Sequence, residues 1–198
     1  MNVLLNGRRG RVGTVLAPAL ESAGHTLVDS LGGADAMVDF TRPDAVLANV
    51  RAAVDAGVPC VVGTTGWDRA QVADAQVAVF VAPNFAIGAV LMMRFAQEAR
   101  RHLEAVEIVE LHHAAKLDAP SGTAKLTAER LGGGVAIHSV RLPGALAHHE
   151  VLLGGPGELL TIRHDATSRE AYVPGVLLAL ERLGSLPPGL TVGLDALV

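Results

Sequence analysis

The sequence predicts an α/β protein: a parallel sheet with helices on both faces, joined to an inserted α+β part with an open, mixed sheet. Three observations predict this. Half of the 198 residues are hydrophobic but only 3% are aromatic, which suits a core of Val, Leu, Ala and Ile between parallel strands and helices. Short apolar runs alternate with helical spacing over the first part of the chain. Farther on, strand-like runs follow one another through Gly/Pro turns.

The first part of the chain alternates strand and helix. Strands are expected at 2–7, 25–30, 36–40, 59–66 and 77–83. Helices are expected at 8–24 and 43–57, with Gly24 and Gly57 as stops and Pro43 in the first turn of the second, followed by a short helix at 67–75. This repetition predicts a parallel sheet.

The pattern changes near residue 85. A long helix is expected at 85–103, a strand at 104–113, a short helix at 121–133, and strands at 134–142, 149–155 and 158–166. A helix at 169–184 and a tail at 189–198 follow. We therefore expect a dinucleotide-binding domain of residues 1–84 plus 171–198, with residues 85–170 inserted as a second domain.

Composition and charge exclude several classes of protein. The net charge is −4 with both signs mixed, and no basic run interleaved with aromatics predicts a nucleic-acid partner. No apolar run approaches the ~20 residues of a membrane span, and the start "MNVLLNG" lacks the pattern of a signal peptide. The single cysteine, Cys60, lies in an apolar strand and fits a reducing compartment, so we expect a cytoplasmic protein.

A glycine-rich loop lies between the first expected strand and the first helix. The segment "NGRRGRVG" has Gly7 for a tight turn, Gly10 for close approach of a pyrophosphate, and Gly13 for close packing of helix on strand. This is typical of a Rossmann-like dinucleotide site, although a merely tight turn is the alternative. Three guanidinium groups could meet phosphate oxygens there, those of Arg8, Arg9 and Arg11.

Polar turns also follow three other expected strands. "DFTRP" follows the third strand, "GTTG" (63–66) the fourth and "APNF" (82–85) the fifth. Ligands of an open parallel sheet bind at the carboxyl ends of its strands. Three such turns on one edge therefore predict a ligand site.

The segment "ELHHAAKLDAPSGTAK" (110–125) gathers ionisable groups just before an expected helix. On a strand, His112 and His113 would point to opposite faces, so they cannot share one role. Ser121 or Thr123 can cap the helix, whose start can hold a carboxylate. With Lys116 nearby, the pattern predicts an anion-binding helix start beside a histidine suited to general acid catalysis.

Three other interpretations stay open. In one, each histidine is an ordinary structural residue. In the second the site is zinc chemistry, but adjacent strand histidines are a poor chelate, and only His148 and His149 could complete a site from elsewhere, so no metal is expected. In the third, the chain is a non-catalytic nucleotide sensor, but a sensor would have no use for proton donors at His112 and Lys116.

The motif E-x-H-H-x-x-K-x-D-A-P-S-G-T, from Glu110 to Thr123, resembles the 4-hydroxy-tetrahydrodipicolinate (dihydrodipicolinate) reductase family. "GRRGRVG", "VDFTRP", "VVGTTGW", "APNFAIG" and "HDATSREAYVPG" resemble other family segments in the same order, over nearly the whole chain. The resemblance implies NADPH- or NADH-dependent reduction of a cyclic dicarboxylate in lysine biosynthesis, by a homotetramer whose second domain binds substrate and forms the oligomer.

The resemblance also implies roles for individual residues. His112 and Lys116 are catalytic, and the substrate is held by His113, Ser121, Gly122 and Thr123. The cofactor is contacted by Gly7, Arg8, Arg9, Gly10, Arg11, Val12, Gly63, Thr64, Thr65, Ala82, Pro83, Asn84 and Phe85.

The chain departs from the family in two shortened segments. "DSLGGADA" (29–36) replaces a longer stretch; its eight residues span at most ~26–29 Å and leave no room for another helix. The acidic residue expected at the adenosine ribose is therefore either Asp29 or Asp35. "LPGALA" (142–147) replaces a longer loop of the second domain, so oligomer contacts could differ.

Overall fold

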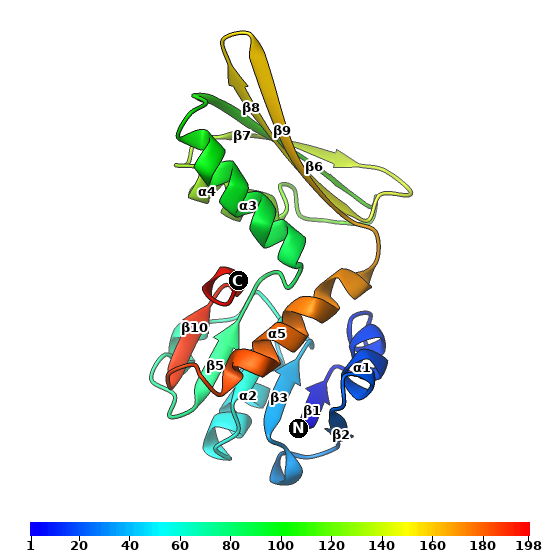
Figure 1. Ribbon diagram of the computed structural model, residues 1–198. Coiled ribbons are helices and arrows are strands. Elements are labelled where there is room, and N and C mark those ends of the chain that lie inside the picture. Colours follow the sequence, from blue (N-terminus) through cyan, green and yellow to red (C-terminus); the bar gives the residue numbers. More distant parts are fainter. The chain divides into compact units, whose positions relative to one another are not determined.

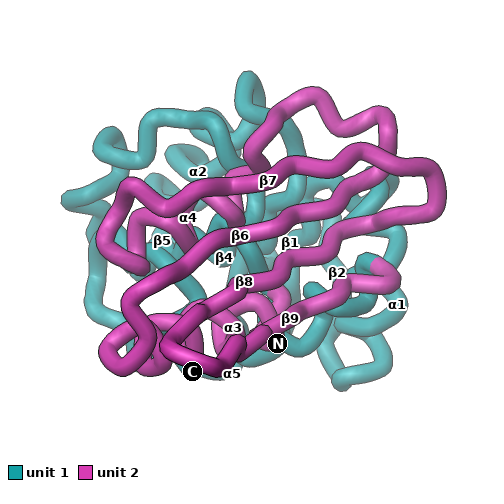
Figure 2. Tube along the Cα trace, turned by 90° about the horizontal axis from the view of Figure 1, so that it is seen from above, with its two compact units in different colours: residues 1–85, 169–198 teal, residues 86–168 magenta.

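The computed structural model describes all 198 residues, which form two compact units. Unit 1 comprises residues 1–85 and 169–198, and unit 2 comprises residues 86–168 (Figure 2). The chain therefore leaves unit 1 once and returns to it.

Unit 1 is built on a six-stranded parallel sheet in the order β10-β5-β4-β3-β1-β2 (Figure 1). Its strands are β1 (Asn2–Asn6), β2 (Thr26–Val28), β3 (Ala36–Asp39), β4 (Cys60–Val62), β5 (Ala78–Val81) and β10 (Gly189–Val192). The central strands β3, β4 and β5 are buried at every residue, as strands covered on both faces should be. The predicted Rossmann-like α/β class is confirmed.

Three helices cover this sheet: α1 (Gly13–Ser22), α2 (Val46–Asp55) and α5 (Val173–Leu183). Helix α2 packs its Val46, Val50 and Ala53 on one face of β3 and β4. Helix α5 contacts α1, β4 and β5 on the other face (Figure 1). Single 3₁₀ turns complete the unit: η1 (Leu31–Gly33), η2 (Arg69–Val72), η3 (Arg169–Tyr172) and η4 (Leu194–Ala196).

Several local expectations for unit 1 were wrong. Helix α2 begins at Val46, so Pro43 lies in a preceding turn closed by Ala45 N–H donating to Arg42 O. Residues 67–75 form the single turn η2 in place of the expected helix, and the Asp68 side chain caps this turn by accepting a hydrogen bond from Ala70 N. The tail contains β10, which pairs with β5 at the sheet edge.

The glycine loop turns tightly between β1 and α1. Gly7 has φ +82°, and a Cβ there would lie 2.3 Å from Phe40 O. A Cβ on Gly13 would lie 2.1 Å from Gly7 O and 2.7 Å from Arg8 Cα. Because these neighbours are backbone atoms, only glycine fits at either position.

We expect Gly13→Ala to destabilise unit 1 by about 1–3 kcal/mol, the usual cost of overpacking a tight contact. The melting temperature in thermal unfolding measures this loss of stability. Gly32→Ala is the matched control, since a Cβ at Gly32 would meet nothing within 4 Å and its φ is not positive. Equal melting temperatures for the two variants would contradict the steric argument.

Unit 2 contains a four-stranded mixed sheet in the order β7-β6-β8-β9 (Figure 2). Its strands are β6 (Ala105–His112), β7 (Ala136–Arg141), β8 (Ala147–Gly155) and β9 (Glu158–Ala166); β6 and β7 are parallel and the other pairs antiparallel. Its helices are α3 (Ile87–Arg100), which contacts β8 and β9, and α4 (Gly122–Arg130), which contacts β6 and β7. The predicted mixed sheet is confirmed.

The two faces of this sheet differ. Ile108, Val151 and Leu153 are fully buried on the face that α3 and α4 cover. The opposite face carries Leu111 and Leu152, which are only partly buried, and Leu159, which is 69% exposed. Unit 2 has no helix to cover this second face.

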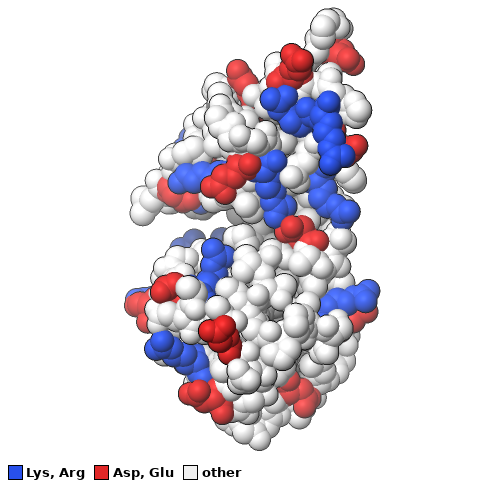
Figure 3. All heavy atoms as spheres, turned by 90° about the vertical axis from the view of Figure 1, so that its left-hand side faces the viewer, with Lys and Arg blue, Asp and Glu red and all other residues white.

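The surface carries both signs of charge. On the face seen in Figure 3, lysine and arginine side chains are interspersed with aspartate and glutamate. None of the helices is both long and apolar enough to cross a membrane.

Candidate active site

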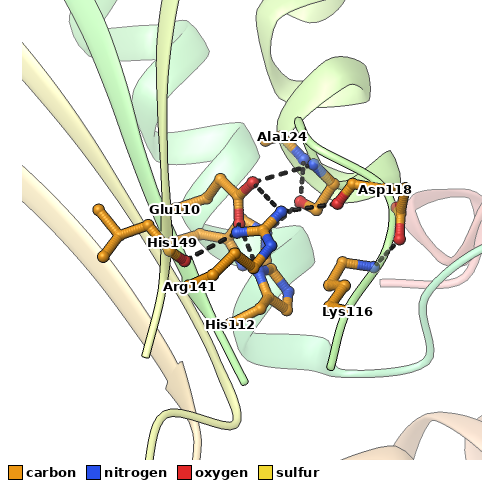
Figure 4. A network of polar contacts seen from close by, with 9 residues as sticks. Glu110, His112, Lys116, Asp118, Ala124, Arg141 and His149 are labelled. Atoms are coloured by element: carbon orange, nitrogen blue, oxygen red, sulfur yellow. Dashed lines mark hydrogen bonds and ion pairs between the residues drawn. The ribbon is translucent and has the colours of Figure 1, made fainter. Parts of the chain in front are cut away.

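A buried carboxylate organises the polar side chains of unit 2. Glu110, in the middle of β6, is fully buried on the covered face of the sheet. Arg141, at the end of β7, donates from Nη1 to Glu110 Oε2 at 2.9 Å and from Nη2 to Oε1 at 2.8 Å (Figure 4). Burial alone would raise the pKa of Glu110, but hydrogen bonds from Arg141, Ser139 and His112 lower it to about 2. The carboxylate is therefore ionised.

His112 lies two residues along β6 and therefore on the same face. Its Nδ1 is hydrogen-bonded to Glu110 Oε2. Burial lowers the pKa of His112, and the nearby charges of Lys116 and Arg141 lower it further, while Glu110 raises it. Since the ionised carboxylate can only accept, the proton of neutral His112 lies on Nδ1 and Nε2 is left as the reactive nitrogen.

The segment between β6 and α4 carries the catalytic candidate Lys116. Lys116 Nζ donates to Asp118 Oδ1 at 2.6 Å, and this bond lowers the pKa of Asp118. Arg141 Nη2 also donates to Asp118 O at 2.6 Å. The guanidinium that holds Glu110 thus also holds the segment bearing Lys116.

Helix α4 begins where the motif predicted. Ser121 is its N-cap, and its Oγ accepts from Ala124 N at 3.2 Å. Ser121 N donates to Glu110 Oε1 at 3.2 Å. Gly122 and Thr123 form the first turn, at the positive end of the helix dipole. The helix start is therefore fixed to the carboxylate that holds His112.

The structure adds a histidine that sequence reasoning did not assign to the site. His149, on β8, is 4% exposed, and its Nε2 lies 2.9 Å from Ser121 Oγ. Burial, followed by proximity to His112, lowers the pKa of His149 to about 4. Neutral His149 is thus hydrogen-bonded through Nε2 to the Ser121 hydroxyl, and its ring meets that of His112 edge-on at 5.1 Å between centroids.

Two candidates differ from their expected settings. Strand β6 ends at His112, so His113 begins the following segment and the argument from opposite strand faces does not apply to it. The Ser121 side chain is already engaged by Ala124 N and His149, which makes it part of the scaffold of the site. His148 pairs with Asp165 at 2.6 Å, and no three His, Cys, Asp or Glu side chains are grouped to hold a metal ion.

In unit 1 a cavity of about 390 Å³ lies at the carboxyl ends of β1 and β2. It is lined by residues 4–10, which include Gly7, Arg8, Arg9 and Gly10, and by Leu27, Val28 and Asp29. Arg11 and Val12 do not line it. In a sheet of this topology ligands bind at the carboxyl ends of the strands. The strand order reverses beside this cavity, between β1 and β3.

The two candidate ribose aspartates lie at opposite ends of the strands. Asp29 directly follows β2 and lines the cavity. Asp35 precedes β3, and its Oδ2 accepts from Asn2 N at 2.7 Å, at the amino ends of β1 and β3. Asp35 is therefore not available to a ligand at the carboxyl edge.

A second buried carboxylate connects two of the predicted loops. Asp39 Oδ1, at the end of β3, accepts from Thr41 Oγ1 at 2.7 Å and from Thr64 Oγ1 at 2.8 Å, and Oδ2 accepts from Asn49 Nδ2 at 2.8 Å. The Thr64 hydroxyl also accepts from Thr41 N at 2.8 Å. Its side chain therefore fixes the loop, and the loop's exposed atoms come from Gly63 main chain and Thr65.

The loop after β5 is anchored by buried side chains. Ala82 and Phe85 are 0% and 2% exposed, and Phe85 packs against Phe40 and Phe80 with ring centroids 5.5 and 6.1 Å apart. Pro83 is exposed and Asn84 partly so. Only main-chain atoms, Pro83 and Asn84 can present themselves to a ligand here.

Comparison with known proteins covers both units. The family described as "Dihydrodipicolinate reductase, N-terminus" matches residues 22–85, and "Dihydrodipicolinate reductase, C-terminus" matches residues 88–198. A solved structure described as dipicolinate-bound dihydrodipicolinate reductase from Paenisporosarcina sp. TG-14 is 30% identical. It superposes with a TM-score of 0.83 and covers 100% of this chain and 99% of that one.

Curated relatives agree with this result. A 4-hydroxy-tetrahydrodipicolinate reductase from Desulfitobacterium hafniense (strain Y51) is 50% identical over 194 residues, 82% of this chain and 72% of the relative. One from Mycolicibacterium smegmatis (strain ATCC 700084 / mc(2)155) is 43% identical over 243 aligned positions, covering 100% of this chain and 99% of the relative. Because this chain has 198 residues, it is shorter within the matched region. The chain belongs to the dihydrodipicolinate reductase family.

Proposed function

We propose that this chain reduces 4-hydroxy-tetrahydrodipicolinate to tetrahydrodipicolinate with loss of water, in diaminopimelate and lysine biosynthesis. The observation that carries the proposal is the Glu110–His112 pair fixed to the start of α4, in a chain whose relatives bear this name. A proton donor beside an anion-binding helix start is what reduction of a dicarboxylate needs.

The cofactor is NADPH or NADH, and unit 1 fits it. Gly7 and Gly13 leave no room for a Cβ, so the turn brings backbone close to the start of α1, where a pyrophosphate is stabilised by free N–H groups and the helix dipole. Arg8 and Arg9 would meet the phosphates, and the turns at 63–65 and 82–85 would contact the nicotinamide end. When bound, the reduced nicotinamide supplies the hydride for ring C4.

The substrate carries two carboxylates, and unit 2 offers cationic groups to hold them. We assign one carboxylate to Gly122 and Thr123 at the start of α4, and place His113 and Lys116 at the substrate as well. The related structure described as dipicolinate-bound supports a planar dicarboxylate as the ligand of this site.

After hydride transfer to C4 the substrate ring takes up a proton, and His112 is assigned as its donor. Lys116 is assigned to stabilise the negative charge that develops on the ring. In the free protein, burial lowers the pKa of His112. A dianionic substrate beside it would favour the charged imidazolium, so substrate binding and proton uptake are coupled. The proton would leave from Nε2, because Nδ1 is bound to Glu110.

Oligomerisation and location complete the proposal. The uncovered face of the sheet, with Leu111, Leu152 and Leu159, supports a homotetramer built on unit 2. A cytoplasmic location is proposed for an enzyme of amino-acid biosynthesis. The assay that tests the function is oxidation of NADH and NADPH, followed at 340 nm, with freshly prepared substrate; no oxidation above the substrate-free rate with either cofactor would refute it.

Cofactor preference should be weak. Asp29, which would repel the 2′-phosphate of NADPH, and the two arginines Arg8 and Arg9, which would attract it, line the same cavity. One exposed charge contact is worth about 1 kcal/mol or less, so the preference should be several-fold.

The ratio of kcat/KM for NADH and NADPH at fixed substrate and salt measures this preference. A ratio beyond about a hundredfold would show that one charge dominates the site. In that case Asp29→Ala decides whether Asp29 is that charge, and Asp35→Ala is the control, because Asp35 is bound to Asn2 N.

A further inference from the structure

Glu110 is fully buried. Besides its ion pair with Arg141 it contacts His112, which has a catalytic assignment. It accepts two hydrogen bonds from Arg141, one from Ser121 N at the start of α4, and it holds His112 Nδ1. These four bonds, together with the hydrogen bond from Ser139, satisfy both oxygens, so the carboxylate is fixed in place.

We propose that Glu110, held by Arg141, is a positioning residue that keeps His112 in one tautomer and in register with the start of α4. The proposal rests on the proposed function, in which His112 gives a proton to the substrate. It adds the reason why the proton is given from Nε2 and why the donor and the carboxylate-binding turn keep a fixed separation.

The tautomer follows from what each neighbour can do. The ionised carboxylate accepts only, so Nδ1 of His112 keeps its hydrogen in both the neutral and the charged ring. Loading a proton on Nε2 gives an imidazolium that the carboxylate stabilises, and donating it restores the neutral ring. Nδ1–H stays on Glu110 throughout, so proton count and charge balance at each turnover.

The register follows from the second oxygen and from Arg141. Glu110 Oε1 accepts from Ser121 N at 3.2 Å, and Arg141 Nη2 reaches both Glu110 Oε1 and Asp118 O. One carboxylate–guanidinium pair therefore ties β6, β7, the segment bearing Lys116 and the start of α4. A displacement of about 1 Å at a reacting group can cost about 10²-fold in rate. Holding His112 and the start of α4 at a fixed separation therefore preserves the rate.

The charged and titratable groups around His112 all come from unit 2. Glu110 shares its strand, Arg141 faces it from β7, His149 faces it from β8, and Lys116, paired with Asp118, faces it from the segment before α4. Glu110 raises the pKa of His112, whereas Lys116 and Arg141 lower it. Removing the negative charge of Glu110 must therefore lower that pKa.

The test uses Glu110→Gln, which keeps the shape and one accepting oxygen but removes the charge and can offer an N–H to His112 Nδ1. We expect kcat to fall by about 10- to 100-fold, as for other groups that orient a functional imidazole. KM for the substrate and the dissociation constant of NADPH should change little. The alkaline limb of the kcat/KM profile should move to lower pH.

The matched control is Glu98→Gln. Glu98 is exposed on α3, outside the site and outside the uncovered face of the sheet, and its Oε2 accepts from Arg101 Nη1 at 2.8 Å, so the variant removes a paired carboxylate away from His112. Activity and pH profile should match the wild type. An unmoved pH profile in Glu110→Gln, with only a lower melting temperature, would overturn the proposal and leave Glu110 a purely structural residue.

A measurement on the wild-type protein needs neither activity nor a variant of Glu110. ¹⁵N-histidine NMR above the pKa of His112 should show hydrogen on Nδ1 and a bare Nε2, with the signal assigned by its loss in His112→Ala. Hydrogen on Nε2 would overturn the proposal even if the enzyme is active. The expected tautomer in a protein that does not reduce the substrate would instead count against the proposed function alone.

Discussion

His112→Ala and Lys116→Ala should each fold yet lose about 10²–10⁴-fold in kcat, the usual contribution of a positioned proton donor or of a group that stabilises developing charge. His112 is the histidine whose Nδ1 is hydrogen-bonded to Glu110, and Lys116 supplies a charge within reach of the same site. Steady-state kinetics with saturating cofactor measures the loss. Circular dichroism and thermal unfolding show that each variant folds.

Lys125→Ala is the matched control for Lys116→Ala, because these are the chain's two lysines and Lys125 is exposed on α4. It should keep wild-type turnover. For the histidine, His102→Ala serves the same purpose, since His102 is exposed just after α3. Wild-type turnover in His112→Ala or Lys116→Ala would remove that residue from the mechanism.

Thr123→Val should weaken binding of a dicarboxylate by about ten- to a hundredfold. Thr123 is the second residue of α4, where its hydroxyl and the helix start are assigned to a substrate carboxylate. A lost hydrogen bond to a charged group costs about 1.5–3 kcal/mol, which gives this range. Calorimetric titration with pyridine-2,6-dicarboxylate measures the effect.

The same variant contains its own control. The cavity proposed for the cofactor is lined by residues of unit 1 alone. The dissociation constant of NADPH should therefore not change in Thr123→Val. Equal weakening of both ligands would indicate general damage. An unchanged dicarboxylate affinity would place the carboxylate elsewhere.

The sequence predicted the class and most elements of this fold because its periodicities are strong. The glycine loop, the nine predicted strands that correspond to β1 to β9, and the start of α4 at Ser121 follow from local chemistry. β10 was missed because "GLTV" has too few apolar residues to predict a strand; its pairing with β5 decides it. The start of α2 was misplaced because Pro43 also suits the preceding turn.

The site was predicted only where its residues are neighbours in sequence. His112, Lys116 and the turn 121–123 lie within one segment, whereas Arg141 and His149 reach it from β7 and β8 through strand pairing. Glu110 stood in the motif but was given no role. A signal was present: alternation on a half-buried strand puts Glu110 on the face of His112, and a buried carboxylate needs a cationic partner.

The central claim is that this chain transfers a hydride from a reduced nicotinamide to ring C4 of 4-hydroxy-tetrahydrodipicolinate. The most direct measurement is one turnover with cofactor deuterated at the nicotinamide C4 position, followed by NMR of the product. We predict one deuterium at ring C4 of each tetrahydrodipicolinate molecule that the wild type forms, and the same labelled product formed about 10²–10⁴-fold more slowly by Lys116→Ala. Oxidation of the cofactor without deuterium at C4 of the product, or no product at all, would contradict the account.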